Sequence, residues 1–307
     1  MRKTMRHQQY LGLALGSGSA RGWAHIGVIR ALTDMGIMPG IMCGSSAGAL
    51  VGGTHAAGYL DEFEKWLRTL TRKKVVAFFD ITMKGGGIIT GDRLFDFFRE
   101  RFGDRLIESL PITFGAVATN LETGNEVWLR SGSLFEAIRA SLSMPGIFTP
   151  VLTEESWFVD GGLVNPVPVS LCRALGAQVV IAVNLNGRLV GKRFLREETS
   201  MSPYKTVKAL AIRIRNEIKG NSSGDDAEFP SAAVRPGLFD VVSGALNIMQ
   251  DRITRSRIAG DPPDIVLSPR LEHLGLLEFH RVSEAVEEGR RCVQEARQAI
   301  ESVVARL

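Results

Sequence analysis

The sequence predicts an α/β fold with a mainly parallel central sheet. Three observations lead to that prediction. Apolar strand segments alternate with helix segments over the first 60 residues. A glycine cluster stands at each of the first two strand-to-helix junctions. The 307 residues are 45% hydrophobic and 23% charged, which excludes an intrinsically disordered chain.

The first four elements follow one another without long loops. Tyr10–Leu15 is a short apolar strand segment, and Arg21–Met35 has the apolar periodicity of a helix that Gly36 ends. Ile37–Cys43 is a second strand segment, and Gly44–Tyr59 is rich in the small residues of a helix packed closely on a sheet. Strands joined by helices in this order pair in parallel through right-handed crossovers.

The rest of the chain supplies further segments of both kinds. We predict strands at Ile112–Thr119, Glu126–Arg130, Ser156–Val159 and Val179–Asn184, and helices at Gly91–Phe102, Leu134–Ser141 and Val169–Leu175. Gly220–Pro236 is polar, acidic and rich in small residues, which indicates a flexible loop. A final amphipathic helix is predicted from about Ser283 to Leu307.

Charge and cysteine content restrict the partners and the compartment. The net charge is +4, and no concentrated basic patch indicates nucleic acid as a partner. A peripheral contact with an anionic membrane stays open. Cys43, Cys172 and Cys292 lie too far apart for a disulfide framework or a zinc site. With no run of 18 apolar residues, we expect a cytoplasmic protein that is soluble or at most peripheral to a membrane.

Gly44-Ser45-Ser46-Ala47-Gly48 has the pattern G-x-S-x-G of a nucleophile elbow. Small residues on both sides of Ser46 permit a sharp turn from strand to helix that exposes its hydroxyl. The backbone N–H groups of the helix N-terminus then face a developing oxyanion. A second match, at 220–224, lacks a preceding strand and a following helix. The alternative for the first match is a close helix–sheet contact without chemistry.

The first glycine cluster, Gly16–Gly22, also lies between a strand and a helix. Its spacing is not the G-x-G-x-x-G of a dinucleotide site, and no carboxylate ends the next strand. The P-loop pattern is missing as well. We interpret the cluster as an anion cradle built from the N–H groups of Gly18 and Ser19. Arg21 either orients this loop, holds negative charge, or is an ordinary exposed helix arginine.

The third element is a carboxylate at the end of an apolar strand. Trp157-Phe158-Val159 leads into Asp160-Gly161-Gly162, where the two glycines permit a turn and a close approach. An Asp-Gly pair alone usually marks only a turn. Its occurrence together with the other two elements gives it significance.

Together these elements resemble the patatin-like phospholipase family. Gly16–Gly22 corresponds to the family's glycine-rich oxyanion loop, Gly44–Gly48 to its G-x-S-x-G and Asp160-Gly161-Gly162 to its D-G-[GA]. The resemblance implies a three-layer α/β/α fold, with a catalytic core at 10–185 and 186–307 as the C-terminal part of the same domain. Ser17 and Ser19 replace two glycines of the family's loop, and a φ above zero there would strain a serine.

The resemblance also implies hydrolysis of acyl esters of phospholipids, lysophospholipids or related lipids. Ser46 would attack the carbonyl and Asp160 would accept its proton, with no cofactor and no metal. An aspartate with an ordinary pKa of about 3.9 is a weak base for this task, so the dyad needs Asp160 to be partly buried. The oxyanion-hole residues would be Gly18, Ser19 and Ala47, supported by Gly16, Arg21, Gly22, Gly44, Gly48, Gly161 and Gly162.

Alternatives remain at this stage. The order Ser46, Asp160 and then His273 or His280 is also that of a Ser-Asp-His triad. A protein of the same fold that binds lipids or a partner without catalysis is a second alternative, and a nucleotide-binding protein a third. Pro203–Lys219 has the pattern of a basic amphipathic helix, which either lies on an anionic membrane or packs on the protein body.

Overall fold

The structure, a computed structural model, describes residues 9–78, 92–153, 156–187 and 238–307. The predicted segments at 203–219 and 220–236 lie outside these residues, as do the second G-x-S-x-G match and His7.

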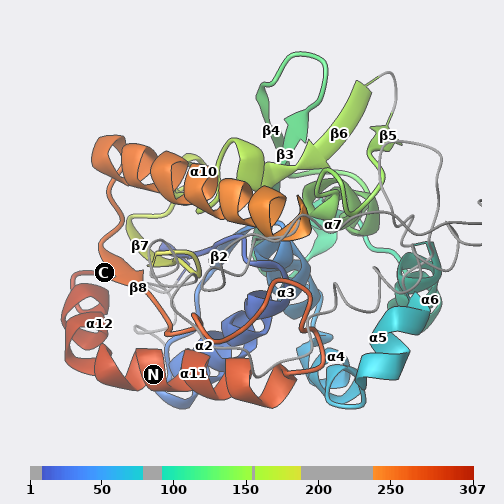
Figure 1. The fold of residues 1–307 in the computed structure, drawn as a ribbon. Coiled ribbons are helices and arrows are strands. Elements are labelled where there is room, and N and C mark those ends of the chain that lie inside the picture. The colour runs from blue at the N-terminus through green and yellow to red at the C-terminus, as the bar shows by residue number, and fades with distance from the viewer. Residues whose placement is uncertain (1–8, 79–91, 154–155, 188–237) are drawn as a thin grey trace, which may run out of the picture.

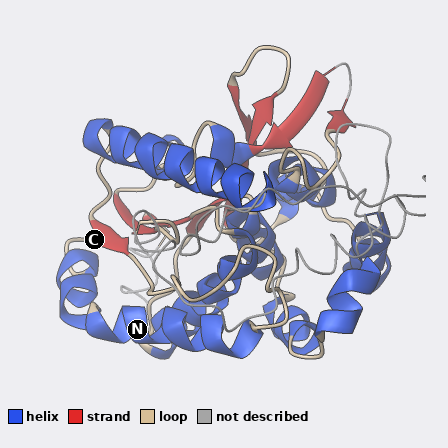
Figure 2. Ribbon diagram, viewed as in Figure 1, coloured by secondary structure: helices blue, strands red, loops and turns tan. Residues whose placement is uncertain are grey.

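Helices enclose a single eight-stranded sheet (Figures 1 and 2). The strands are β1 (Leu11–Leu15), β2 (Ile41–Ser45), β3 (Thr113–Asn120), β4 (Glu126–Leu129), β5 (Val151–Thr153), β6 (Ser156–Asp160), β7 (Val179–Val183) and β8 (Ile265–Leu267). The α-helices are α2 (Ala24–Asp34), α3 (Ala47–Ala56), α4 (Leu60–Leu67), α5 (Arg72–Phe78), α6 (Asp92–Phe102), α7 (Leu134–Leu142), α8 (Val169–Ala174), α10 (Leu238–Gly260), α11 (Val282–Glu295) and α12 (Arg297–Val304). Short 3₁₀ helices are η1 (Ser19–Trp23), η2 (Ile107–Ser109) and η3 (Gly161–Leu163).

The sheet is mixed but mostly parallel, which confirms the predicted fold class. Its strand order is β5-β6-β3-β2-β1-β7-β8, with β4 paired to β3. The five adjacent strands β3, β2, β1, β7 and β8 pair in parallel with one another. Strands β4 and β6 pair antiparallel with β3, and β5 pairs antiparallel with β6. Because β1 and β2 are parallel central strands, their carboxyl ends, and the loops that follow them, meet at one edge of the sheet.

Both faces of the sheet are buried, as expected for a parallel sheet covered by helices. In β1, Leu11, Leu13 and Leu15 belong to the larger hydrophobic core. Ala14, between them in sequence, belongs to the smaller core on the opposite face, where Leu171 of α8 also packs. The alternation follows from the period of two in strand side chains.

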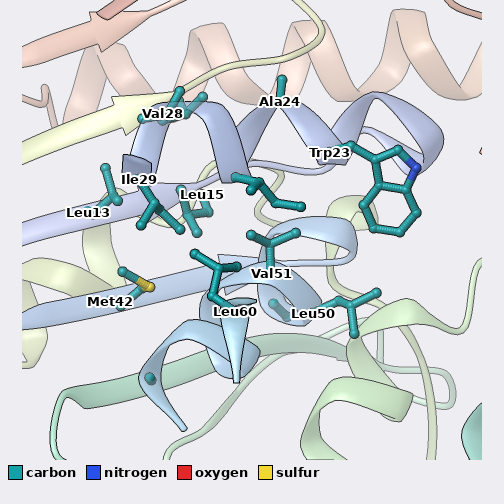
Figure 3. Packing of buried hydrophobic residues seen from close by; sticks show 14 of the residues in the cluster. Leu13, Leu15, Trp23, Ala24, Val28, Ile29, Met42, Leu50, Val51 and Leu60 are labelled. Carbon is teal, nitrogen blue, oxygen red and sulfur yellow. The ribbon is translucent and has the colours of Figure 1, made fainter. Parts of the chain in front are cut away.

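The larger core joins the first helices to the sheet. Figure 3 shows Ile29 of α2 near Leu13 and Leu15 of β1, with Val51 of α3 below them and Val28 on the opposite side of α2. All of these side chains are at most 3% exposed. The contact fixes the start of α2 and the start of α3 relative to the ends of their strands.

Helices α2 and α11 cross at very short range. A Cβ on Gly27 would lie 1.9 Å from the Val286 carbonyl oxygen, and one on Gly289 would lie 2.0 Å from the Ala24 carbonyl oxygen. Each glycine therefore accommodates the backbone of the other helix. The crossing places α11 against the outer side of α2 (Figure 1).

The structure corrects one predicted element and adds others. The single terminal helix predicted over 283–307 is two helices, because the chain turns at Ala296 between α11 and α12. No glycine or proline marks that break. Helices α4, α5 and α10 and strands β5 and β8 were not expected from the sequence.

Two further findings concern the cysteines and the membrane. All three cysteines are buried free thiols. Over the described residues, no helix combines the length and the apolar character that a membrane span needs.

Alanine should have opposite effects on stability at two helical glycines, one inside the α2–α11 crossing and one outside it. Gly289→Ala should lower the free energy of unfolding by about 1–3 kcal/mol, because the new methyl group meets backbone that must move. Gly244→Ala in α10, where a Cβ meets no heavy atom within 4 Å, should raise it by up to about 1 kcal/mol. Urea unfolding of both variants measures this, and a stabilised Gly289→Ala protein would contradict the crossing.

Candidate active site

Ser46 stands at the turn between β2 and α3. Its φ of 55° lies in the left-handed region that a non-glycine residue rarely occupies. The neighbouring glycines permit the turn: a Cβ on Gly44 would lie 2.3 Å from the Ala49 nitrogen, and one on Gly48 would lie 2.0 Å from the Leu15 oxygen. The Ser46 N–H donates to the Ser141 hydroxyl of α7 at 2.9 Å. Strand, turn and α7 together hold the strained backbone.

Asp160 reaches Ser46 because β6 lies one strand away from β2. The register pairs Ser45 with Val117 and Asp160 with Ala118, so adjacent residues of β3 connect the two strand ends. The Ser46 hydroxyl donates to Asp160 Oδ2 at 2.5 Å. The sequence separates these two residues by 114 positions, and only the strand order brings them together.

The Asp160 carboxylate is fully enclosed and held at both oxygens. The residue is 1% exposed, and the Gly162 N–H donates to its Oδ1 at 2.7 Å. Its backbone N–H donates to the Ser143 oxygen at 2.9 Å, and the Thr119 hydroxyl donates to its backbone oxygen at 2.8 Å. The carboxylate orientation is therefore fixed before any substrate binds.

Burial makes this carboxylate more basic than usual. Removal from water raises the pKa of Asp160 to about 6, against the lowering effect of the hydrogen bonds from Ser46 and Gly162. At neutral pH the carboxylate is still ionised. It can therefore accept a proton, and it holds that proton better than an exposed aspartate does.

The glycine-rich loop lies directly beside this pair. The Ser17 N–H donates to the Pro166 oxygen at 2.8 Å and the Ala20 N–H to the Leu276 oxygen at 3.1 Å. The N–H groups of Gly18, Ser19 and Ala47 donate no hydrogen bond within the part of the chain that the structure describes. All three belong to the residues that the sequence analysis selected for the oxyanion hole.

The two serines of this loop have different backbones. Ser19 has a φ of 51°, so the expected strain exists there, whereas Ser17 is not in the left-handed region. The Ser19 hydroxyl donates to the Leu276 oxygen at 2.7 Å, and the Ser17 hydroxyl donates to the Ser45 hydroxyl at 3.2 Å. Each serine thus adds a side-chain contact that glycine would not make.

The supporting glycines share a steric reason. Each lies where a Cβ would overlap another segment of the site, and none is in the left-handed region of φ. The distances from such a Cβ are 2.6 Å to Val183 O for Gly16, 2.5 Å to Leu185 Cδ1 for Gly18, 2.3 Å to Ala47 Cβ for Gly22, 2.1 Å to Val117 O for Gly161 and 2.5 Å to Ser17 Oγ for Gly162. Glycine is favoured here because backbone or side-chain atoms of a neighbouring segment approach closely, not because of a left-handed turn.

Arg21 is 1% exposed, so its interpretation as an exposed helix arginine is wrong. Its Nε donates to the Gly18 oxygen at 3.2 Å and its guanidinium also donates to Asn247 Oδ1 at 3.1 Å. Sequence reasoning missed Ser141 and Asn247 as partners of the site. The signal for Asn247 was a row of polar residues at helical spacing within 243–254.

The described histidines do not contact Ser46 or Asp160. His280 accepts from Arg72, and His273 lies 3.7 Å from a Glu284 oxygen. His25 is buried, its pKa is lowered to about 4 by desolvation, and its Nε2 lies 2.7 Å from the Gly16 oxygen. Since the ring is neutral, Nε2 carries the proton and donates to the loop. The geometry gives the Ser-Asp-His alternative no support.

No group of three or more His, Cys, Asp or Glu side chains with metal-binding geometry occurs among the described residues. The polar groups around Ser46 Oγ are hydroxyls, backbone N–H groups and the Asp160 carboxylate, which accepts from Ser46 and Gly162.

The fold and the serine elbow define an α/β protein with a buried Ser-Asp pair at the carboxyl edge of its sheet. The sequence model of the patatin-like phospholipase family matches residues 13–173. An uncharacterized NTE family protein of Mycobacterium tuberculosis is 34% identical over 95% of this chain and 92% of its own length. The chain therefore belongs to the patatin-like phospholipase family.

Two more distant similarities complete the comparison. A lysophospholipase of Emericella nidulans is 33% identical over 57% of this chain, which corresponds to 12% of that protein. The solved structure of VipD from Legionella pneumophila aligns over 95% of this chain and 66% of its own, with a TM-score of 0.43 and 13% identity.

The buried carboxylate predicts a stability effect that depends on pH. A carboxyl group whose pKa rises on folding stabilises the native state below about pH 4, and this contribution is lost as the pH rises through about 6. Asp160→Asn keeps the shape and removes the charge. The free energy of unfolding of the variant should therefore exceed that of the wild type. The difference should grow between pH 4 and pH 7 and reach about 3 kcal/mol.

Chemical denaturation at several pH values measures that difference. Ser46→Ala is the control, because it keeps the carboxyl group: its stability should still fall as the pH rises, over a range that extends to higher pH, since the hydrogen bond that lowers the pKa of Asp160 is lost. A difference between Asp160→Asn and wild type that does not vary with pH would contradict the raised pKa.

Proposed function

We propose that this chain hydrolyses acyl esters of phospholipids, lysophospholipids or related lipids, with Ser46 as nucleophile and Asp160 as base. The observation that carries the proposal is the 2.5 Å hydrogen bond from Ser46 Oγ to Asp160 Oδ2. It joins a nucleophile directly to a carboxylate whose pKa burial has raised to about 6. The two groups form the smallest set that nucleophilic ester cleavage needs.

Acylation begins when Ser46 Oγ attacks the ester carbonyl carbon while its proton passes to Asp160 Oδ2. The carbonyl oxygen becomes an oxyanion, which the N–H groups of Gly18, Ser19 and Ala47 would stabilise. When the tetrahedral intermediate collapses, the carbon–oxygen bond to the leaving alcohol breaks. The alkoxide takes the proton from Asp160 and departs as the free alcohol, which leaves Ser46 acylated.

Deacylation repeats these steps with water. The water oxygen attacks the acyl carbon while Asp160 accepts a proton from the water. The same N–H groups hold the second oxyanion. Collapse breaks the bond to Ser46 Oγ, which recovers its proton from Asp160. The fatty acid leaves, and the Ser46–Asp160 hydrogen bond is restored.

Lipid esters are the proposed substrates because the family is one of phospholipases. A relative that aligns over 57% of this chain is named a lysophospholipase.

Activity-based labelling tests the roles of both residues. A fluorophosphonate probe should label the wild type, and Ser46→Ala should abolish both labelling and hydrolysis of p-nitrophenyl acyl esters. Asp160→Asn should lower kcat at least about 100-fold, because the proton of Ser46 loses its acceptor. The matched control is Ser222→Ala, which changes the serine of the second G-x-S-x-G match at 220–224.

His273→Gln and His280→Gln complete this experiment and should each retain full activity. Loss of activity in either would replace the dyad by a triad. A folded wild-type protein that neither reacts with the probe nor turns over any acyl ester would favour the non-catalytic lipid-binding alternative.

Peripheral contact with an anionic membrane is a further part of the proposal. Lys73 and Lys74 are exposed on α5. On α10, the large apolar side chains of Val241, Ile248 and Met249 are about half exposed, at 52%, 48% and 51%. Exposed cations and exposed apolar groups each suit a surface of acidic headgroups.

Vesicle flotation tests this contact. Binding to vesicles with phosphatidylglycerol should exceed binding to pure phosphatidylcholine and should fall as salt screens the charges. The double variant Lys73→Gln/Lys74→Gln should weaken binding by about tenfold or more, since each lysine near the surface contributes about 1 kcal/mol. The control is Arg306→Gln, which changes an exposed residue next to the C-terminal Leu307; the C-terminus lies on the side of the molecule away from α5 (Figure 1). Binding that depends on neither salt nor lipid charge would contradict the proposal.

A further inference from the structure

Helix α10 buries a polar face. Ser243, Asn247, the adjacent pair Gln250 and Asp251, and Thr254 follow one another at steps of three or four residues, so they share one side of the helix. All five are at most 6% exposed. A surface helix usually has the opposite arrangement, with polar residues outside. Because buried polar groups need partners, the contacts of this face indicate what the helix does.

Asn247 connects α10 to the glycine-rich loop through Arg21. The Asn247 side-chain oxygen accepts from the guanidinium of Arg21 at 3.1 Å. The same guanidinium donates through Nε to the Gly18 carbonyl oxygen at 3.2 Å. The backbone N–H of Arg21 also donates to this oxygen, at 3.1 Å. Two donors from one residue thus fix a single carbonyl group, and Asn247 fixes the side chain of that residue.

The Gly18 carbonyl group determines where a neighbouring N–H points. Gly18 C=O and Ser19 N–H belong to the same planar trans peptide, in which the two groups point in opposite directions. A donor that holds the Gly18 oxygen on one side therefore aims the Ser19 N–H to the other. This N–H is one of the three assigned to the oxyanion hole.

Gln250 provides a second connection, one turn further along α10. Its Oε1 accepts from the Asn186 amide at 2.8 Å, and that amide also reaches the Ser17 carbonyl oxygen at 3.4 Å. Its Nε2 lies 2.6 Å from the point where a Cβ on Gly162 would be. The polar face of α10 thus borders both the glycine-rich loop and the turn after Asp160. Figure 1 shows the helix crossing the molecule from the side of α7 toward β7.

We propose that α10 sets the geometry of the oxyanion hole, with Asn247 as a positioning residue that acts through Arg21 on the Gly18–Ser19 peptide. The inference rests on the proposed function and deepens it. It assigns a role at the reaction centre to a helix outside residues 13–173, the part that the family's sequence model matches. The residue itself does not touch the reacting atoms.

Two substitutions at Asn247 test the role, and a third residue provides the control. Asn247→Leu removes the acceptor at similar volume, and Asn247→Asp keeps an oxygen acceptor for Arg21. Thr254→Val is the matched control on the same buried face, because the Thr254 hydroxyl has no hydrogen-bond partner among the described residues. Asn247→Ala replaces Asn247→Leu if the latter does not fold.

Two readouts separate positioning from general stability. With a p-nitrophenyl acyl ester, Asn247→Leu should lower kcat between about 10- and 100-fold with KM changed less than about threefold, since small misplacements at a reacting centre have effects of this size. Asn247→Asp should keep kcat within about threefold of the wild type, and Thr254→Val should match the wild type. Hydrogen–deuterium exchange of peptides that cover 16–23 should be faster in Asn247→Leu only.

Each outcome has a separate consequence. Unchanged exchange and unchanged kcat in Asn247→Leu would overturn the inference. A loss of kcat in Thr254→Val equal to that in Asn247→Leu would also overturn it, because the effect would then be general packing. Faster exchange in Asn247→Leu, combined with a wild-type protein that has no turnover, would support the positioning by α10 and overturn the proposed function.

Discussion

The site depends on close approach of three backbone segments at the carboxyl edge of a parallel sheet. The turn at Ser46, the loop Gly16–Gly22 and the turn after Asp160 meet at distances that leave no room for a Cβ at the glycines between them. Packing of β1, β2, α2 and α3 around the larger core fixes the first two segments. The antiparallel strand β6 delivers the third. A side chain at any of these contacts would separate groups that must act within hydrogen-bonding distance.

Close approach also determines the electrostatics of the pair. Since Asp160 is enclosed, its charge is disfavoured and its pKa rises. The hydrogen bonds from Ser46 and Gly162 offset this effect only in part. The native state thus holds a destabilised carboxylate at neutral pH, and the rest of the fold must supply the stability that maintains it. Such a conflict between local stability and chemistry is typical of catalytic sites.

Helix α10 shows how an element far along the chain can complete a site whose motifs lie near its beginning. Its polar face borders the glycine-rich loop through Arg21 and Asn186, and its exposed face has apolar side chains. His25 and Leu276 hold the same loop from other directions. The loop is therefore surrounded by contacts from several separate parts of the sequence, which explains how Ser19 can keep a left-handed backbone.

Much of the fold and of the candidate site could be predicted from the sequence, because local patterns carry that information. The alternation of apolar segments predicted the α/β class, and the positions of glycines predicted the turns at Ser46 and after Asp160. The sequence could not predict α10, whose reversed polarity has the opposite pattern to a surface helix, nor β5 and β8, which have only three residues each. It could not decide whether Arg21 is exposed or buried, or whether His273 or His280 lies near Ser46 and Asp160. Both questions depend on contacts between residues far apart in the chain. The strand order and the packing of α10 decided them, since only the assembled sheet determines which distant groups share a buried, weakly polarisable environment.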